Sequence, residues 1–164
     1  MVGMKNKVSL VLAASFLVWA LTLSPGRAAA GCGWPKVLDG SLNSSSHLHT
    51  ARTMSIDEAR SELMRKHQAL TLCLSSQVFV QYYASVSLVL GRFGRKFCGW
   101  PLVGHGSANP NEHLLAARAL GKTGVTRELA HRFKTLSECL DRDWFCRLYA
   151  AVSLVQAEYG TGQR

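Results

Sequence analysis

Four polar residues of this chain recur 66 positions later, each in the same order and of the same type. The pairs are Asn43 and Asn109, His47 and His113, Arg52 and Arg118, and Glu62 and Glu128. A histidine, an arginine and a glutamate held together can bind an anion or move a proton. The same three residues can also form an internal network in which each glutamate pairs with the histidine or the arginine of the neighbouring short helix. We expect the internal network, and we keep these His, Arg and Glu pairs as candidate binding residues.

Two tryptophans show the same recurrence. Trp34 and Trp100 each stand in a Cys-Gly-Trp-Pro motif, where an exposed ring would stack on a carbohydrate or contact a protein partner. Their position between glycine and proline, beside a cysteine, favours a packing role at the end of a helical hairpin. We therefore expect both rings to pack, with binding as the alternative.

Most motifs of catalysis and cofactor binding are absent from the sequence. It contains no C-x-x-C, C-x-x-C-H, G-x-S-x-G or H-E-x-x-H motif and no phosphate-binding loop. His47 and His49 are separated by a single residue and cannot share one face of a helix. We expect no cofactor and no metal. One enzymatic alternative remains, a cell-envelope hydrolase that uses Glu62 or Glu128, although glycan cleavage needs two carboxylates in different environments.

The recurrence extends over most of the chain. Residues 32–97 align without a gap on residues 98–163 with 25 identical positions of 66, where composition alone gives roughly 4. This pattern is typical of a tandem duplication, and it predicts two structural repeats, residues 31–97 and 98–164.

Each repeat predicts three helices after its Cys-Gly-Trp-Pro turn. In the second repeat the first helix begins at Asn109-Pro110 and ends before Gly121. In the first repeat, Ser55 to Glu58 forms a capping box that begins a helix reaching about Leu74. Residues 78–89 resemble a β-strand by residue type, but the aligned segment of the second repeat, after Asp141, has the apolar spacing of an amphipathic helix. We predict helix for both, ending near Gly91 or Gly94 and near Gly160, and an all-α fold in which the repeats pack as one pseudo-symmetric domain.

The N-terminal segment predicts export. Lys5 and Lys7 precede an apolar run from Val8 to Leu23, and small residues follow as far as Ala30. This is the pattern of a signal peptide, residues 1–30, cleaved after Ala30. An uncleaved membrane anchor is the alternative, and Cys32 is a weak candidate for lipidation. We expect a periplasmic or secreted protein that contacts the membrane only through the signal segment before cleavage.

All five cysteines lie in the mature part, which predicts disulfides. The spacing from Cys32 to Cys73 equals the spacing from Cys98 to Cys139, so we expect one bridge in each repeat. The rival scheme crosses the repeats and joins Cys73 to Cys98 and Cys32 to Cys139. Cys146 has no counterpart, and it would be able to link two chains into a homodimer.

Charge adds little to the prediction of function. Residues 31–164 hold 16 Lys and Arg against 10 Asp and Glu, and the densest basic segment, residues 92–96, is expected to be a solvated connector between the repeats. Nucleic-acid binding would need a basic stripe with interleaved aromatic residues, so no nucleic-acid partner is expected. We expect an exported helical binding or accessory protein without catalytic activity, such as an inhibitor or an immunity-type protein. Its partner is expected to be another exported or envelope protein.

Overall fold

The computed structural model describes residues 31–162, so the predicted signal peptide lies outside the described part of the chain. Residues 31–162 form five α-helices and two short 3-10 turns, and they contain no strand. The predicted all-α class is therefore confirmed. The helix predicted for residues 78–89 is confirmed as well, because this segment lies inside one long helix.

In the first half, residues 31–97, three helices follow a short turn. The elements are η1 (Leu38–Gly40), α1 (Ser44–Thr53), α2 (Ile56–Cys73) and α3 (Ser76–Phe97). Each α-helix begins after a polar residue whose side chain accepts a hydrogen bond from a backbone N–H of the first turn: Asn43, Ser55 and Ser75. The predicted capping box is present, with Ser55 and Glu58 bonded in both directions.

The second half is built from η2 (Gly104–Gly106), α4 (Pro110–Cys139) and α5 (Arg142–Thr161). Asn109 and Asp141 cap the two helices. Gly121 interrupts α4 with a φ of 63° and a ψ of 178°, so α4 consists of two helical segments joined at a kink. The predicted end of the first helix at this glycine is therefore confirmed in the backbone, although the chain resumes its helix without a connecting loop.

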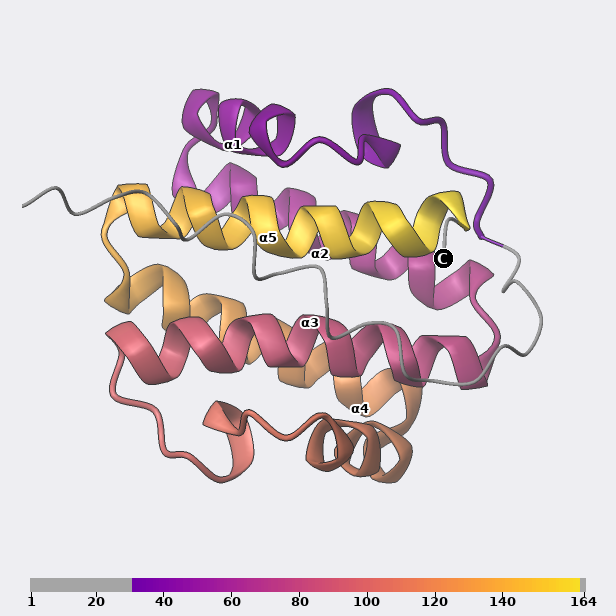
Figure 1. Cartoon of the computed structure of the whole chain (residues 1–164), viewed down its shortest axis with the longest axis vertical. Helices are drawn as coiled ribbons and strands as arrows, with labels where there is room; N and C mark the ends of the chain where they lie inside the picture. Colours follow the sequence, from indigo (N-terminus) through magenta and orange to yellow (C-terminus); the bar gives the residue numbers. More distant parts are fainter. Residues whose placement is uncertain (1–30, 163–164) are drawn as a thin grey trace, which may run out of the picture.

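The helices of the two halves interleave. In Figure 1, α3 and α5 lie side by side in front, with α2 behind α5 and α4 behind α3, and each of these neighbours is in contact. The short helix α1 packs on α5, and the first turns of α4 pack on α3 at the opposite end. The last helix of each half thus packs against the first helix of the other. The core between them is formed by fully buried residues that include Leu63, Leu70, Tyr82, Val86, Leu129, Phe133, Leu136, Leu148 and Val152.

One disulfide closes each half. Cys32 is bonded to Cys73 and Cys98 to Cys139, with Cα–Cα distances of 5.6 and 5.8 Å. The predicted pairing within each half is confirmed, and the crossed scheme is wrong. The two bridges close loops of equal length, and each stabilises the fold by about 4 kcal/mol in the chain-entropy model. The Sγ atom of Cys32 is used in this bond, so it is not available for a lipid.

Cys146 is a buried free thiol on α5. It belongs to the apolar core, where a cysteine packs like a small hydrophobic residue. A bridge between two chains would require this side chain to leave the core. The homodimer through Cys146 stays a prediction that this burial argues against.

The basic segment 92–96 is not a connector. It forms the last turns of α3, which continues to Phe97. The glycines that suggested a helix end lie inside the helix, where another part of the chain approaches them. A Cβ on Gly91 would lie 3.0 Å from the carbonyl oxygen of His105 and 3.1 Å from that of Ser107. A Cβ on Gly94 would overlap the ring of Trp100. These glycines permit close contact with the neighbouring segments and do not stop the helix.

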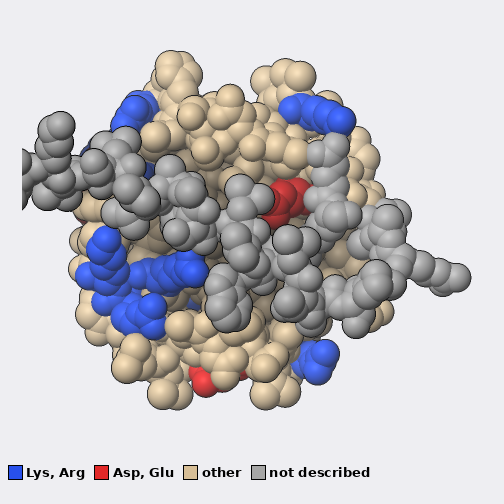
Figure 2. All heavy atoms as spheres, viewed as in Figure 1, with Lys and Arg blue, Asp and Glu red and all other residues tan. Residues whose placement is uncertain are grey.

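Basic side chains gather where α3 ends. Figure 2 shows this group at the end of the molecule that holds the last turn of α3, which carries Arg95 and Lys96. The Lys96 ammonium lies 5.4 Å from the ring centre of Trp144 and 5.0 Å from that of Phe97. Part of this charge is therefore held against aromatic faces in cation–π contacts.

No helix in residues 31–162 combines the length and the apolar character that crossing a membrane requires.

Candidate functional site

Two polar clusters lie where the halves meet. Each is formed by side chains from the 3-10 turn and the first two helical segments of one half. A serine and a tyrosine from the last helix of the other half complete it. The Lys66 cluster consists of Asp39, His47, Glu62, Arg65, Lys66, Tyr149 and Ser153. The Arg132 cluster consists of Tyr83, Ser87, His105, His113, Glu128, His131 and Arg132.

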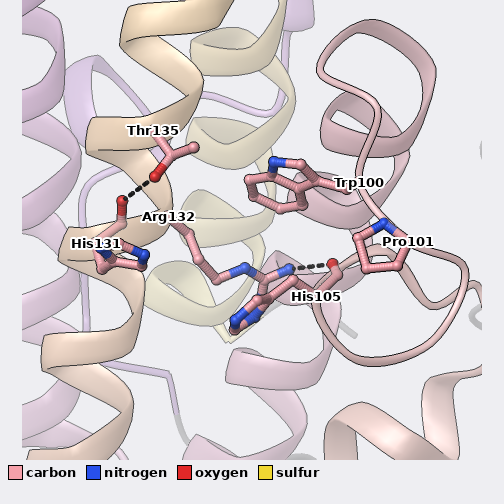
Figure 3. A pocket seen from close by; sticks show the side chains of 6 residues that line it. All are labelled: Trp100, Pro101, His105, His131, Arg132 and Thr135. Carbon is pink, nitrogen blue, oxygen red and sulfur yellow. Dashed lines mark hydrogen bonds between the residues drawn. The ribbon is translucent and has the colours of Figure 1, made fainter.

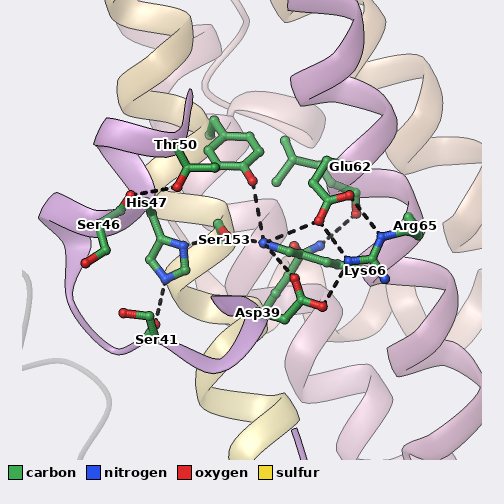
Figure 4. Close-up of polar contacts among 12 residues, drawn as sticks. Asp39, Ser41, Ser46, His47, Thr50, Glu62, Arg65, Lys66 and Ser153 are labelled. Atoms are coloured by element: carbon green, nitrogen blue, oxygen red, sulfur yellow. Dashed lines mark hydrogen bonds and ion pairs between the residues drawn. The ribbon is translucent and has the colours of Figure 1, made fainter. Parts of the chain in front are cut away.

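Lys66 is the centre of the first cluster and is almost completely buried. Its Nζ donates to Ser153 Oγ at 2.9 Å and lies 3.8 Å from Asp39 Oδ1 and 3.9 Å from Glu62 Oε1 (Figure 4). Burial lowers the pKa of Lys66, and the charges of Asp39 and Glu62 oppose that shift. The two carboxylates therefore supply the opposite charge that a buried ammonium needs.

Glu62 is held ionised in this cluster. Arg65 donates to both of its carboxylate oxygens, at 2.9 and 2.8 Å, and a further hydrogen bond joins Arg65 to Asp39 at 2.9 Å. The hydrogen bonds from Arg65 lower the pKa of Glu62. A carboxyl group with a lowered pKa is a poor general acid, because catalysis at neutral pH requires a raised one.

His47 connects Lys66 to the backbone. Its Nε2 lies 2.6 Å from the carbonyl oxygen of Ser41, and its Nδ1 lies 2.9 Å from Ser153 Oγ. Burial lowers the pKa of His47, so the ring is neutral at neutral pH. In that form Nε2 donates to the carbonyl, and Nδ1 accepts from the hydroxyl that Lys66 also contacts. Both ring nitrogens have internal partners.

The Arg132 cluster repeats this arrangement with different residues. His113 Nε2 lies 2.9 Å from the carbonyl oxygen of Ser107, and its Nδ1 lies 2.6 Å from Ser87 Oγ. Arg132 also donates to the Ser87 hydroxyl, and it donates to the carbonyl oxygens of Ser87 at 3.2 Å and His105 at 2.7 Å. Burial lowers the pKa of both His113 and Arg132.

The single acidic residue of this cluster binds a histidine. Glu128 Oε1 lies 2.8 Å from His105 Nδ1. Arg132 has no carboxylate within 4.0 Å among the described residues, unlike Lys66. The guanidinium instead lies 5.3 Å from the ring centre of Trp100.

A small pocket opens beside Arg132. It has a volume of about 100 Å³, and its walls are Trp100, Pro101, His105, His131, Arg132 and Thr135 (Figure 3). In the close-up, the Arg132 side chain extends from α4 between the indole of Trp100 and the imidazoles. No acidic residue lines this pocket.

The structure separates the predicted His, Arg and Glu sets. His47 and Glu62 lie in one cluster and His113 and Glu128 in the other, each set around its own buried cation. Arg52 and Arg118 are exposed, and Arg52 pairs with Asp143 at 3.5 Å. Glu62 contacts Arg65 and Lys66, and Glu128 contacts His105, so the predicted pairing of each glutamate with the recurring histidine or arginine of the short helix is wrong.

Each tryptophan packs at the end of the last helix of the other half, Trp34 on α5 and Trp100 on α3. The backbone N–H of Trp34 donates to the carbonyl oxygen of Gly160 at 3.0 Å, and that of Trp100 donates to Gly94 at 3.0 Å. A Cβ on either glycine would overlap the indole ring. These contacts agree with the expected packing role, and both rings remain half-buried.

Sequence reasoning missed the two buried cations and their serine partners. Lys66 and Arg132 are aligned when residues 32–97 are laid over residues 98–163, but they differ in type and so escaped a search for identical residues. Ser87 and Ser153 are identical in the two halves and lie on otherwise apolar helix faces. A search for recurring charge, combined with polar residues inside apolar stripes, would have found all four.

Within residues 31–162 no three His, Cys, Asp or Glu side chains converge as metal ligands. Comparison of the chain with protein-family models, with curated proteins and with solved structures finds no significant match in any of the three.

Proposed function

We propose that this chain is an exported, non-catalytic helical protein that binds another exported or envelope protein, as an inhibitor or an immunity-type protein does. Its two halves are copies of one ancestral three-helix unit, and residues 31–164 are the mature form. The two intramolecular disulfides are consistent with folding in an oxidising compartment, which supports a periplasmic or secreted location.

Matched contacts support the duplication. Besides the 25 identities, the His47–Ser153 and His113–Ser87 bonds join equivalent residues of opposite halves. The Trp34–Gly160 and Trp100–Gly94 bonds also join equivalent residues. Two equivalent sets of contacts are the expected result of two like units packed around a pseudo-two-fold axis.

The observation that carries the binding proposal is a pair of exposed apolar residues after each Cys-Gly-Trp-Pro motif. Val37 and Leu38 are 72% and 83% exposed, and Leu102 and Val103 are 69% and 75% exposed. Leu38 also has a φ of 67°, a conformation that disfavours side chains with a Cβ. Folding gains nothing from an exposed leucine in a strained conformation, whereas a partner surface would bury it.

The hydrolase alternative lacks a general acid. Glu62 is bound by Arg65, which lowers its pKa, and Glu128 is bound by His105. Both carboxyls contact basic side chains, whereas the general acid of a glycosidase needs an apolar environment that raises its pKa. The geometry therefore favours binding over glycan cleavage.

Site-specific photo-crosslinking in the cells that produce the protein tests the proposal. A photoreactive residue at position 38 or 103 should capture a defined partner, because both positions belong to the exposed apolar pairs that follow the Cys-Gly-Trp-Pro motifs. The same label at Leu72, which is 88% exposed on α2, is the matched control and should capture less. Equal capture from all three positions would contradict the proposal.

A second assay addresses the alternative. Purified protein should not cleave peptidoglycan. The double variant Glu62→Gln/Glu128→Gln should leave crosslinking from positions 38 and 103 unchanged. Turnover by the unaltered protein that the double variant abolishes would replace the binding proposal with the hydrolase.

A further inference from the structure

Arg132 carries a buried positive charge that no carboxylate of the described chain contacts. The residue is 2% exposed, and its NH1 and NH2 groups are bonded to Ser87 and to the carbonyl oxygen of His105. These partners are neutral. A buried charge ordinarily has a partner of opposite charge, because leaving it alone in the interior is costly.

One donor of this guanidinium has no partner. The Arg132 Nε–H is buried and makes no hydrogen bond within the described residues. A buried, unsatisfied donor costs roughly 1–3 kcal/mol, and native proteins contain few of them. The side chain that carries it forms a wall of the pocket of about 100 Å³.

We propose that this pocket binds a carboxylate group from outside the chain, with the Arg132 guanidinium as its cationic partner and the Nε–H as its buried donor. The proposal does not rest on the identity of the protein partner inferred above. The carboxylate would belong to a free small molecule or to a side chain of a partner, and the chemistry of the site is the same for both.

The first half of the chain provides an internal comparison. When the two halves are aligned, Asp39 corresponds to His105, and Lys66 corresponds to Arg132. Asp39 contributes a carboxylate 3.8 Å from the Lys66 ammonium, whereas His105 contributes an imidazole that binds Glu128. The second cluster thus lacks a counterpart of Asp39, one of the two carboxylates beside Lys66. The charge of Glu128 acts on Arg132, but its carboxylate contacts His105, so a ligand would supply the missing contact.

The other walls fit a small monoanion. His105 and His131 contribute nitrogens, Trp100 contributes an apolar ring, and no wall residue is acidic. The arginine that lines the pocket has one unsatisfied buried donor and a charge without a carboxylate in contact, which suits a carboxylate better than a phosphate dianion with three oxygens to satisfy.

A titration followed by NMR tests this site directly. Sodium acetate added to the protein at constant ionic strength should shift the Arg132 Nε–H resonance with saturation, and sodium chloride should not. A blocked Gly-Gly-Glu-Gly-Gly peptide and its glutamine counterpart then distinguish the source. If the glutamate peptide binds at least tenfold more tightly than acetate and the glutamine peptide does not bind, the carboxylate is a side chain presented by a partner. If the glutamate peptide binds less than tenfold more tightly than acetate, the carboxylate belongs to a free small molecule.

Variants locate the effect. His105→Asp places a carboxylate where Asp39 stands in the other half, so it should weaken acetate binding at least tenfold, and Arg132→Gln should abolish it. The matched control Arg127→Gln removes a charge from the same helix outside the pocket and should change the affinity less than twofold.

Three results would overturn the proposal: no saturable shift with acetate, the same loss in Arg127→Gln as in Arg132→Gln, or unchanged binding in His105→Asp. The last variant keeps the test valid if Arg132→Gln does not fold, because the His105 side chain is largely exposed.

Discussion

His67 links the stability of the fold to pH. The ring is fully buried between the Tyr82 hydroxyl at 3.0 Å and the Thr126 hydroxyl at 3.1 Å, and burial lowers the pKa of His67 to about 4. Between pH 6.5 and 4 the unfolded chain binds a proton at this residue that the folded chain does not. The free energy of unfolding should therefore fall as the pH decreases through this range, by about 3 kcal/mol in total from His67.

His67→Phe tests this dependence, because Phe133 occupies the aligned position of the second half. Urea unfolding at pH 4.5, 5.5 and 6.5 should show a smaller change in unfolding free energy than in the unaltered protein. His47 and His113 have lowered pKa values too, so part of the dependence remains. Replacing the exposed His49 by glutamine is the control and should leave the dependence unchanged, while an unchanged dependence in His67→Phe would contradict the assignment.

Leu38 is predicted to lower stability in favour of binding. Leu38→Gly should raise the free energy of unfolding by about 1 kcal/mol, because glycine adopts a φ of 67° without strain. Gly104→Leu is the reciprocal change at the aligned position, where a Cβ meets no other atom, and it should cost about the same. Denaturant midpoints measure both changes. Equal stability in all three proteins would show that the Leu38 backbone is not strained.

The candidate site could be predicted from the sequence only in part. Identity between the halves found His47, His113, Glu62 and Glu128, and all four lie in the polar clusters. It also selected Arg52 and Arg118, which are exposed. Identity records what both halves retained but not which side chains face inward, and the buried cation differs in type between the halves.

A substitution at Gly94 in α3 tests how the Cys-Gly-Trp-Pro motif is held against its neighbouring helix. Gly94→Ala should destabilise the protein by about 1–3 kcal/mol, although alanine favours helices, because its Cβ would overlap Trp100. Ser61→Ala in α2 is the control: Ser61 is exposed on its helix and alanine favours helices, so stability should be unchanged or higher. Thermal unfolding compares the two variants. A stabilised Gly94→Ala would contradict the packing described for Trp100.

Helix starts were predictable, but the end of α3 was not. Ser55, Asn109 and Asp141 cap their helices by bonds to residues two or three positions away, so the local sequence contains the whole signal. Gly91 and Gly94 suggested that α3 stops early, but they meet a turn and an indole of the other half. A contact of this kind depends on the tertiary fold, which a local pattern does not record.

The crossed packing of the two halves predicts that neither half folds alone. In residues 31–97 by themselves, α1 would lack α5, and His47 would lack Ser153. We expect this fragment to show no cooperative unfolding by circular dichroism as a monomer, and an equimolar mixture with residues 98–164 to regain it. The intact chain is the reference. A monomeric fragment that unfolds cooperatively would contradict the interleaved arrangement.

We have proposed that this helical protein is exported, and its structure is held by one disulfide in each half. Mass mapping of the protein isolated from its own cells, without reduction, tests this most directly. We predict a chain that begins at Gly31, contains peptides joined through Cys32–Cys73 and Cys98–Cys139, and retains Cys146 as a thiol. A chain that keeps residues 1–30, has reduced cysteines or joins Cys73 to Cys98 would contradict it.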